Sequence, residues 1–358
     1  NVFYVNQSPY AEGASIYVDG GKAVLIENNL IRDGDYGIEI SAENDKSTIA
    51  FETQDITVRN NLIYNCRSAG LKIGNYKGKL QNALVSGNTC FYNNRGGRRD
   101  GDTGGTSANV GAWAELVVDN MQDVKINSNI FYARSSNTAM INSDANALIS
   151  NLTMNYNLWY NKNNAAGTGL TFQFKINGTN YSYNSYTNYK TNNTFNFDKQ
   201  SKYGNPSFVN ENIAGNNTVN PDLHIQTGSI AIAGGDPAAV SGTNRGEWGT
   251  ADYYGNARIV GTIDMGAHEL SSGTLKSKDR SAIQLQVYPN PAMYAIKMKG
   301  LFEKMYHVKI SDESGNIVKT EVARSSSVSI NSSTLKRGWY ILTATADDDE
   351  RSVKFYKQ

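Results

Sequence analysis

The sequence predicts an all-β protein in which a right-handed parallel β-helix is followed by a small antiparallel β-sandwich. Three observations carry this prediction: an imperfect repeat in the first half, the composition, and a change of pattern near the C-terminus. The 358 residues include 33 glycines and 22 tyrosines, and together with abundant Asn, Ser and Thr this favours strands and turns over helices. A chain of this length can form more than one domain.

The repeat consists of alternating apolar residues followed by a turn that contains an asparagine. Its asparagines fall in one column: Asn29, Asn61, Asn88, Asn129 and Asn157. Alternation points the apolar side chains into a core, while an amide can both donate and accept between stacked turns. One strand and one corner per repeat, each stacked on the last, is the pattern of a parallel β-helix.

A second strand recurs in the same coils as SIYVD, GIEIS, GLKIG and ELVVD. Their common register points one column of side chains outward: Tyr17, Glu39, Lys72 and Val117. Because neighbouring strands lie about 4.8 Å apart, we expect Glu39 directly beside Lys72 on the outer face. Three more acids are expected to flank this lysine there: Asp19, Glu115 and Asp119.

The charge balance limits the classes of partner. With 34 basic and 33 acidic residues the net charge is +1, which argues against nucleic acid or an anionic membrane as a general partner. No stretch approaches the roughly 20 apolar residues of a spanning helix. No signal peptide opens the chain, and its first residues already look extended, so we expect a fragment or mature form whose N-terminal coils or cap lie elsewhere. Cys66 and Cys90 are expected to be free, partly buried thiols.

The pattern weakens after Trp159. Residues 177–197 form a polar and aromatic run with little periodicity, which we expect to be either irregular outer coils or a long surface loop. Residues 271–282 are polar and aperiodic and are expected to be a linker. The expected domains are therefore a β-helix over residues 1–270 and a sandwich over residues 283–358.

The end of the β-helix region resembles the closing coil of bacterial right-handed parallel β-helix proteins. The matching residues are Asp252, Gly255, Arg258, Asp264, Gly266, Ala267 and Glu269. His268 stands where an aromatic residue is usual. The resemblance implies the architecture and says nothing of a reaction, and we interpret Arg258, Asp264 and Glu269 as a structural salt-bridge and capping network.

The C-terminal segment shows short alternating strands joined at ESGN and KRG, a pattern typical of an antiparallel sandwich. It resembles the type A C-terminal sorting domain of the Bacteroidetes type IX secretion system at these residues: Tyr288, Pro289, Asn290, Pro291, Gly315 and Gly338. The resemblance implies a secreted or outer-membrane cell-surface protein. Its partners would be the translocon, the shuttle and the sortase of that system, acting on residues 283–358. An ordinary terminal binding module is the alternative.

Two consecutive coils, DYGIEIS and GLKIGN, resemble polysaccharide lyase family 9. The resemblance implies that Asp35, Glu39 and Glu43 bind Ca²⁺ and that Lys72 removes the proton next to a uronate carboxylate, with Glu39 beside it in the catalytic site. A polysaccharide substrate would then contact the residues around this coil: Arg67, Tyr17, Tyr76, Glu115 and Asp119.

The chemistry of Lys72 depends on the metal. A lysine is protonated at neutral pH, and nearby carboxylates favour that charged form. A bound Ca²⁺ would neutralise the carboxylates and hold the substrate. Without it, Glu39 and Lys72 form a cross-strand ion pair on a solvated sheet, which is the interpretation that we favour. The alternatives to a lyase are a non-catalytic glycan binder or adhesin, with tyrosines for sugar stacking, and a glycoside hydrolase with two outward carboxyls.

Overall fold

The chain forms two compact units, Asn1–Gly273 and Thr274–Gln358. The division falls in the segment that the sequence marks as a linker, which lies outside the described residues. The computed structural model describes these ranges: 1–4, 13–42, 53–74, 78–96, 113–133, 138–143, 148–213, 221–239, 248–270, 285–299, 306–312, 315–323, 328–346 and 349–358.

The first unit is built from three sheets that the chain visits in turn. The first sheet contains β1 (Val2–Tyr4), β4 (Leu30–Arg32), β7 (Leu62–Tyr64), β10 (Thr89–Phe91), β13 (Ile130–Ala133), β16 (Leu158–Asn161) and β19 (Lys202–Tyr203). The second contains β2 (Ala14–Asp19), β5 (Tyr36–Ser41), β8 (Ala69–Ile73), β11 (Ala114–Val118), β14 (Ala139–Ser143), β17 (Thr168–Ile176) and β18 (Thr179–Ser185). The third contains β3 (Lys22–Glu27), β6 (Gln54–Arg59), β9 (Leu80–Ser86), β12 (Met121–Asn127) and β15 (Ile149–Asn155).

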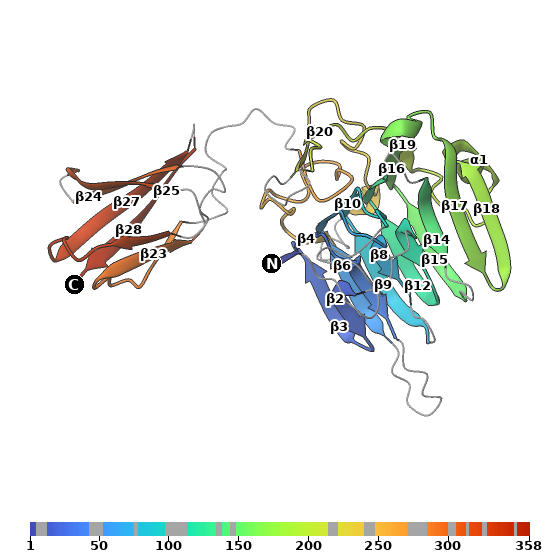
Figure 1. The fold of residues 1–358 in the computed structure, drawn as a ribbon, viewed down its shortest axis with the longest axis horizontal. Coiled ribbons are helices and arrows are strands. Elements are labelled where there is room, and N and C mark those ends of the chain that lie inside the picture. The colour runs from blue at the N-terminus through green and yellow to red at the C-terminus, as the bar shows by residue number, and fades with distance from the viewer. Residues whose placement is uncertain are drawn as a thin grey trace, which may run out of the picture. The chain divides into compact units, whose positions relative to one another are not determined.

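Each of the first five coils contributes one strand to each sheet, and successive coils pair in parallel. In the coil that starts at β7, for example, β7, β8 and β9 pair with β10, β11 and β12 of the next coil. Figure 1 shows these strands stacked coil after coil along the first unit. The predicted parallel β-helix is therefore confirmed.

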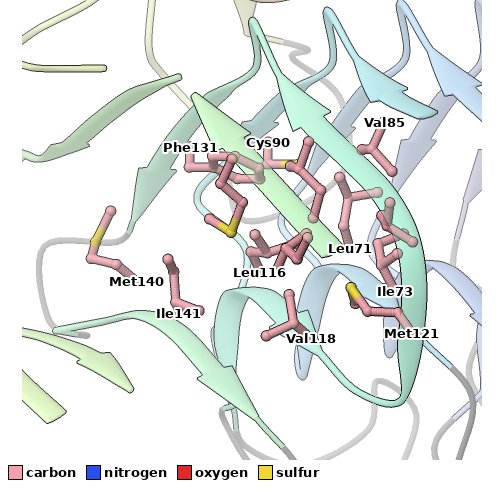
Figure 2. Close-up of a cluster of buried hydrophobic side chains, with 14 of the residues drawn as sticks. Leu71, Ile73, Val85, Cys90, Leu116, Val118, Met121, Phe131, Met140 and Ile141 are labelled. Carbon is pink, nitrogen blue, oxygen red and sulfur yellow. The ribbon is translucent and has the colours of Figure 1, made fainter. Parts of the chain in front are cut away.

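The interior of the coils is a continuous apolar core. It is filled by the alternating residues of the predicted strands, among them Leu71, Ile73, Val85, Leu116 and Val118, which are at most 1% exposed. Figure 2 shows these side chains together with Cys90 and Phe131. Cys66 and Cys90 are free and buried, as the sequence predicts.

The predicted asparagine column forms a continuous amide ladder. Each Nδ2 donates to the Oδ1 of the next asparagine, at 2.9 Å from Asn29 to Asn61, 2.8 Å from Asn61 to Asn88, 3.0 Å from Asn88 to Asn129 and 3.1 Å from Asn129 to Asn157. Each side chain also binds backbone groups of the turns, as Asn88 does with Val58 and Ser86. The ladder thus satisfies buried backbone that no strand can pair.

The ladder ends at Asp198, which the sequence analysis did not single out. Its carboxylate accepts from Asn157 Nδ2 at 3.0 Å, Trp159 Nε1 at 3.1 Å and the Tyr189 hydroxyl at 2.7 Å. Burial raises the pKa of this carboxyl, while these donors act in the opposite direction. A carboxyl oxygen of Asp198 therefore takes the place of the next amide oxygen in the stack.

The segment 177–197 is neither irregular outer coils nor a long loop. β18 pairs with β17 as an antiparallel hairpin, and α1 (Tyr186–Asn192) follows, with Ser185 accepting from Asn188 N at its start. Tyr189 stacks on Phe172 at 4.6 Å between ring centroids and is fully buried. The tyrosines therefore cover the last coil of the core, which explains why they follow no strand period.

After β19, described residues of the segments 204–213, 221–239 and 248–270 pack on the outer face of the first sheet. They include β20 (Phe208–Asn210), β21 (Asp222–Ile225) and the 3-10 helix Pro237–Ala239; the 3-10 helix Lys162–Asn164 lies earlier in the chain. Phe208, Leu223 and Met265 pack against outward residues of the first sheet such as Tyr132 and Leu158. This segment therefore covers the first sheet with a second apolar layer.

The second unit is an antiparallel sandwich, as predicted. One sheet contains β22 (Gln286–Tyr288), β23 (Ala295–Lys299) and β26 (Val328–Asn331), and the other contains β25 (Ile317–Ala323), β24 (Tyr306–Asp312), β27 (Gly338–Ala346) and β28 (Asp349–Lys357), in that order. A separate core lies between them, with Ile296, Ile310, Leu342 and Phe355 almost completely buried.

Candidate functional site

The predicted outward column of the second sheet is present in the expected register. Tyr17 pairs with Glu39, Glu39 with Lys72, and Lys72 with Val117 on adjacent parallel strands. Lys72 Nζ lies 2.9 Å from Glu39 Oε1, and it also lies 5.3 Å from the centroid of the Tyr36 ring. The ammonium group is therefore held by a carboxylate and by an aromatic face.

The environment of this pair differs from the expected solvated sheet. Lys72 is 9% exposed and Glu39 is 5% exposed, whereas Tyr17 in the same column is 42% exposed. The prediction of a solvated surface pair is therefore wrong. Exposure of an outward side chain depends on what packs over it, and the periodicity of a single strand does not contain that information. A desolvated pair costs more to form than a surface pair and needs close partners on both sides.

Asp35 and Arg67 form a second buried ion pair one coil apart. Arg67 Nε donates to Asp35 Oδ1 at 2.9 Å, a second guanidinium nitrogen contacts the same oxygen, and both side chains are 0% exposed. The other oxygen, Oδ2, accepts from Gly13 N at 2.9 Å. Arg67 therefore does not present its guanidinium to solvent, contrary to the predicted substrate contact.

The described residues do not fit the calcium site implied by the sequence. Both oxygens of Asp35 already accept hydrogen bonds, and Glu39 is engaged by Lys72. Within the described ranges there is no group of three or more His, Cys, Asp or Glu residues arranged to hold a metal ion. Glu43, the third expected ligand, lies outside the described residues, as does the expected substrate contact Tyr76.

Glu115 lies in the corner of the core and not on the face of Lys72. Its Oε2 accepts from Asn93 Nδ2 at 3.0 Å, and Asn93 Oδ1 accepts from Cys66 N at 3.0 Å. Burial raises the pKa values of the Cys66 and Cys90 thiols, and the nearby Glu115 carboxylate adds to this effect. The predicted role of Glu115 in binding substrate on the outer face is therefore wrong.

Gly70 makes room for this inward arrangement. A Cβ atom at Gly70 would lie 2.7 Å from Asn93 Nδ2, closer than carbon and nitrogen can approach. Asn93, which the sequence analysis missed, therefore occupies space that only a glycine leaves open. The sequence contained a signal for this position. Asn93 lies two residues after the end of β10, just as Cys66 lies two residues after the end of β7, so the two residues occupy equivalent positions in neighbouring coils.

The two aspartates of the predicted face occupy different environments. Asp119 is 1% exposed, and its backbone N donates to Ile73 O at 2.9 Å. Asp19 is exposed and pairs in register with Ser41. Asp19 and Asp119 are three strand spacings apart, about 14 Å, which is wider than the separation of two hydrolase carboxyls.

The closing-coil residues form the structural network that the sequence predicts. Arg258 Nη1 lies 2.8 Å from Glu269 Oε2, and Arg258 Nη2 donates to the carbonyls of Asp264 and Gly266. Asp252 Oδ2 accepts from Glu269 N at 2.8 Å. Arg258 is 0% exposed. Burial lowers the pKa of its guanidinium, whereas the neighbouring carboxylates raise it. These contacts fix the turns of residues 252–270 and leave no charge open to a ligand.

His268 gives this region a pH dependence. Its Nδ1 accepts from Ile225 N at 3.0 Å, so this nitrogen must be unprotonated, and burial lowers its pKa to about 3. An unfolded histidine takes up its proton near pH 6.5, so the folded state loses stability as the pH falls from 6.5 toward 3, by up to about 1.4 kcal/mol per pH unit.

Burial raises the pKa of the neighbouring Glu269 to about 8, which gives the opposite slope between about pH 4.5 and 8. We therefore expect the contribution of His268 to appear in urea unfolding as the difference between wild type and His268→Phe, with the variant losing less stability as the pH falls. His307→Phe, which changes a histidine of the second unit, is the matched control and should leave the slope of the first unit unchanged. An equal slope in wild type and His268→Phe would contradict this assignment.

The sorting-signal residues stabilise the sandwich. Asn290 Oδ1 accepts from Tyr356 N at 2.9 Å, and Ala292 N donates to Tyr356 O at 2.7 Å, so the segment Tyr288–Pro291 is tied to β28. Gly315 has a φ of 85° in the turn between β24 and β25, a conformation that glycine adopts without a steric cost. Gly338 begins β27.

Comparison with known proteins gives one informative match. Residues 286–358 match the family described as "Secretion system C-terminal sorting domain". "Uncharacterized protein YwoF" of Bacillus subtilis is 36% identical over 91 residues, which is 25% of this chain and 18% of that protein. Full-length tailspike protein 2 of Escherichia coli O157:H7 bacteriophage CAB120 aligns with 93% of this chain and 51% of its own at 11% identity, with a TM-score of 0.16.

Only the sorting-domain match supports a conclusion. The chain spans about a fifth of the length of its curated relative and about half of the tailspike chain, and the TM-score is too low to carry an argument. Within the described residues no helix is both long and apolar enough to cross a membrane. The C-terminal residues 286–358 therefore form a sorting domain that directs this protein through type IX secretion to the cell surface or the surrounding medium.

Proposed function

We propose that the exported β-helix binds an extracellular polysaccharide with acidic sugars at the outer face of the second sheet, around Tyr17, Glu39 and Lys72. One observation carries the proposal: the outward column of that sheet contains a charged pair that is less than 10% exposed. Outward positions of a β-helix need no buried charge for folding, because the core is filled from the other face of the same strands. Desolvated charged groups with close partners are candidates for functional sites.

The surroundings suit a sugar ligand. Tyr17 is 42% exposed and adjacent to Glu39 in the register, so its ring can stack on a sugar. Lys72 supplies a positive charge that attracts a uronate carboxylate, and Glu39 can accept from sugar hydroxyls. The Asp35–Arg67 pair lies in the turn before these strands and fixes their start.

The catalytic form of the proposal is β-elimination of a uronate glycan with Lys72 as the base. A bound Ca²⁺ would neutralise the substrate carboxylate. The described carboxylates, Asp35 and Glu39, do not fit a calcium site because other groups already engage them. The Glu39 carboxylate at 2.9 Å favours the protonated form of Lys72, and a protonated amine cannot accept a proton. The geometry therefore favours binding over elimination.

A binding assay on the purified protein tests the site. Pectate, alginate and glycosaminoglycans are titrated against wild type and Lys72→Met, and we expect an about tenfold weaker affinity for the bound glycan in the variant. Lys22→Met, on exposed β3 of the third sheet, is the matched control and should bind as wild type does. Glu39→Gln combined with Lys72→Met removes both charges, so a folded and non-binding double variant separates the site from a loss of stability.

The same glycans test for elimination. Absorbance of unsaturated uronate products is followed with added Ca²⁺ and with chelator. Product formation that is lost in Lys72→Met would establish the lyase. Binding without product, in either condition, supports a non-catalytic glycan binder or adhesin. Wild-type affinity in Lys72→Met for every glycan bound would rule out the proposed site.

The second unit has its own partners in the secretion system. We propose that the translocon and shuttle of the type IX system recognise residues 283–358 and that a sortase then separates them from the β-helix. The match over residues 286–358 supports this proposal. The protein would accordingly come from a bacterium of the Bacteroidetes.

A further inference from the structure

The sorting domain exposes an apolar surface on the outer face of its four-stranded sheet. Trp339 and Ile341 of β27 are 43% and 42% exposed, and Ile317 of β25 is 57% exposed. Ile317 and Ile341 both pair with Ser311, so they lie in one cross-strand row. We call Ile317, Trp339 and Ile341 the outer patch. The residues that alternate with them point into the sandwich core: Tyr340, Leu342 and Ala344.

A basic rim surrounds the outer patch. Lys354 pairs with Ile341, and its Nζ lies 4.8 Å from the centroid of the Trp339 ring. Arg337 Nε donates to the Tyr356 hydroxyl at 3.1 Å, beside Trp339. Lys309 lies on the same face, one row further along β24. The register places one acidic residue, Glu350, on this face as well, opposite Thr345 and four residues along β27 from Ile341.

The fold does not require this surface. The sandwich has its own core on the opposite face of the same strands, and neighbouring exposed apolar residues cost solubility unless a partner covers them. Tyr288–Pro291, in contrast, is tied to β28 through Asn290 and Ala292. The motif Tyr288–Pro291 therefore stabilises the sandwich. The outer patch is the better candidate for the surface that a partner protein recognises.

We propose that the outer patch and its basic rim form the surface through which the sorting domain docks on a protein of the type IX secretion apparatus. The docking face of that protein would have an apolar centre and acidic groups around it, because the rim on this chain is basic. In such interfaces a few central aromatic and aliphatic residues contribute most of the binding energy, and a polar rim surrounds them. The proposal rests on the sorting role of residues 286–358 and is independent of the glycan site.

Export of the full-length protein tests the outer patch. Wild type and Ile341→Asp are produced in a bacterium with an active type IX system, and the protein outside the cell is compared with that in the periplasm. We expect export to fall about tenfold for Ile341→Asp. Met293→Asp is the matched control, because Met293 is 52% exposed but precedes β23 of the other sheet.

Charge reversal tests the rim. Lys309→Glu combined with Lys354→Glu should also retain the protein in the periplasm, whereas Lys297→Glu on β23 should not. Thermal unfolding of each purified variant verifies that the sandwich is folded, and binding of the glycan by the same samples should be unchanged. Wild-type export of folded Ile341→Asp, or an equal loss in Met293→Asp, would overturn the docking surface. Wild-type export of the double charge reversal would overturn the acidic partner.

Discussion

Removal of residues 274–358 is expected to abolish export and to leave the β-helix folded. The two units have separate cores: the apolar clusters of the first unit contain only residues before 271, and that of the second contains only residues after 284. Deleting the second unit therefore takes no side chain from the first core. It removes the whole segment that matches the sorting domain.

The measurement compares the truncated and full-length proteins in a bacterium with type IX secretion, both behind the same inner-membrane export leader. We expect the truncated protein in the periplasm, with the same unfolding transition as the β-helix of the full-length protein and the same glycan binding. The converse control attaches residues 274–358 to an unrelated periplasmic protein and should carry it outside. Truncated protein that reaches the medium as efficiently as full-length protein would show that the address lies elsewhere.

The architecture was predictable because the same short sequence pattern recurs in each coil. The column from Asn29 to Asn157 gives the corner of each coil, and the register that aligns Glu39 with Lys72 follows from two short strands. Both patterns depend on neighbours one coil away, and stacking repeats the same environment in each coil. The sequence therefore predicts the fold and the pairing of Glu39 with Lys72.

The direction of Glu115 was not predictable from alternation. Ala114 and Val117 pack in one cluster although they are three residues apart, so the strand does not alternate strictly between them. Leu116 still points into the core, and Glu115 turns to Asn93 at the corner. Alternation assumes a regular pleat, which fails where a strand joins a turn.

The burial of Lys72 and Arg67 was also not predictable from the sequence. The apolar pattern distinguishes the inner face of a strand from its outer face, but it does not say whether the outer face meets water. The pair Asp35–Arg67 spans 32 residues, one coil, so coil spacing would have placed the two side chains together. Its complete burial is a property of the tertiary packing.

Replacement of Arg67 by methionine is expected to destabilise the β-helix by about 3–5 kcal/mol, because it leaves the buried Asp35 carboxylate without its guanidinium. Methionine retains much of the length and apolar volume of the arginine stem, which limits the loss of packing. Urea unfolding followed by tyrosine and tryptophan fluorescence gives the change in free energy. Lys162→Met removes a cation that also pairs with a carboxylate, Glu211, but whose side chain is 56% exposed, and it should cost about 1 kcal/mol or less.

The double variant Asp35→Leu with Arg67→Met distinguishes the charge from the packing. Arg67 Nη1 is buried and makes no hydrogen bond with any described residue, so the pair does not fully recover the cost of desolvating the guanidinium. An apolar replacement of both partners should therefore regain most of the stability that the single variant loses. A double variant as unstable as Arg67→Met would assign the loss to the arginine stem. If the double variant is stable and still binds glycan, the charges of the pair are needed for neither the fold nor the ligand, and ligand recognition belongs to Lys72, Glu39 and Tyr17 alone.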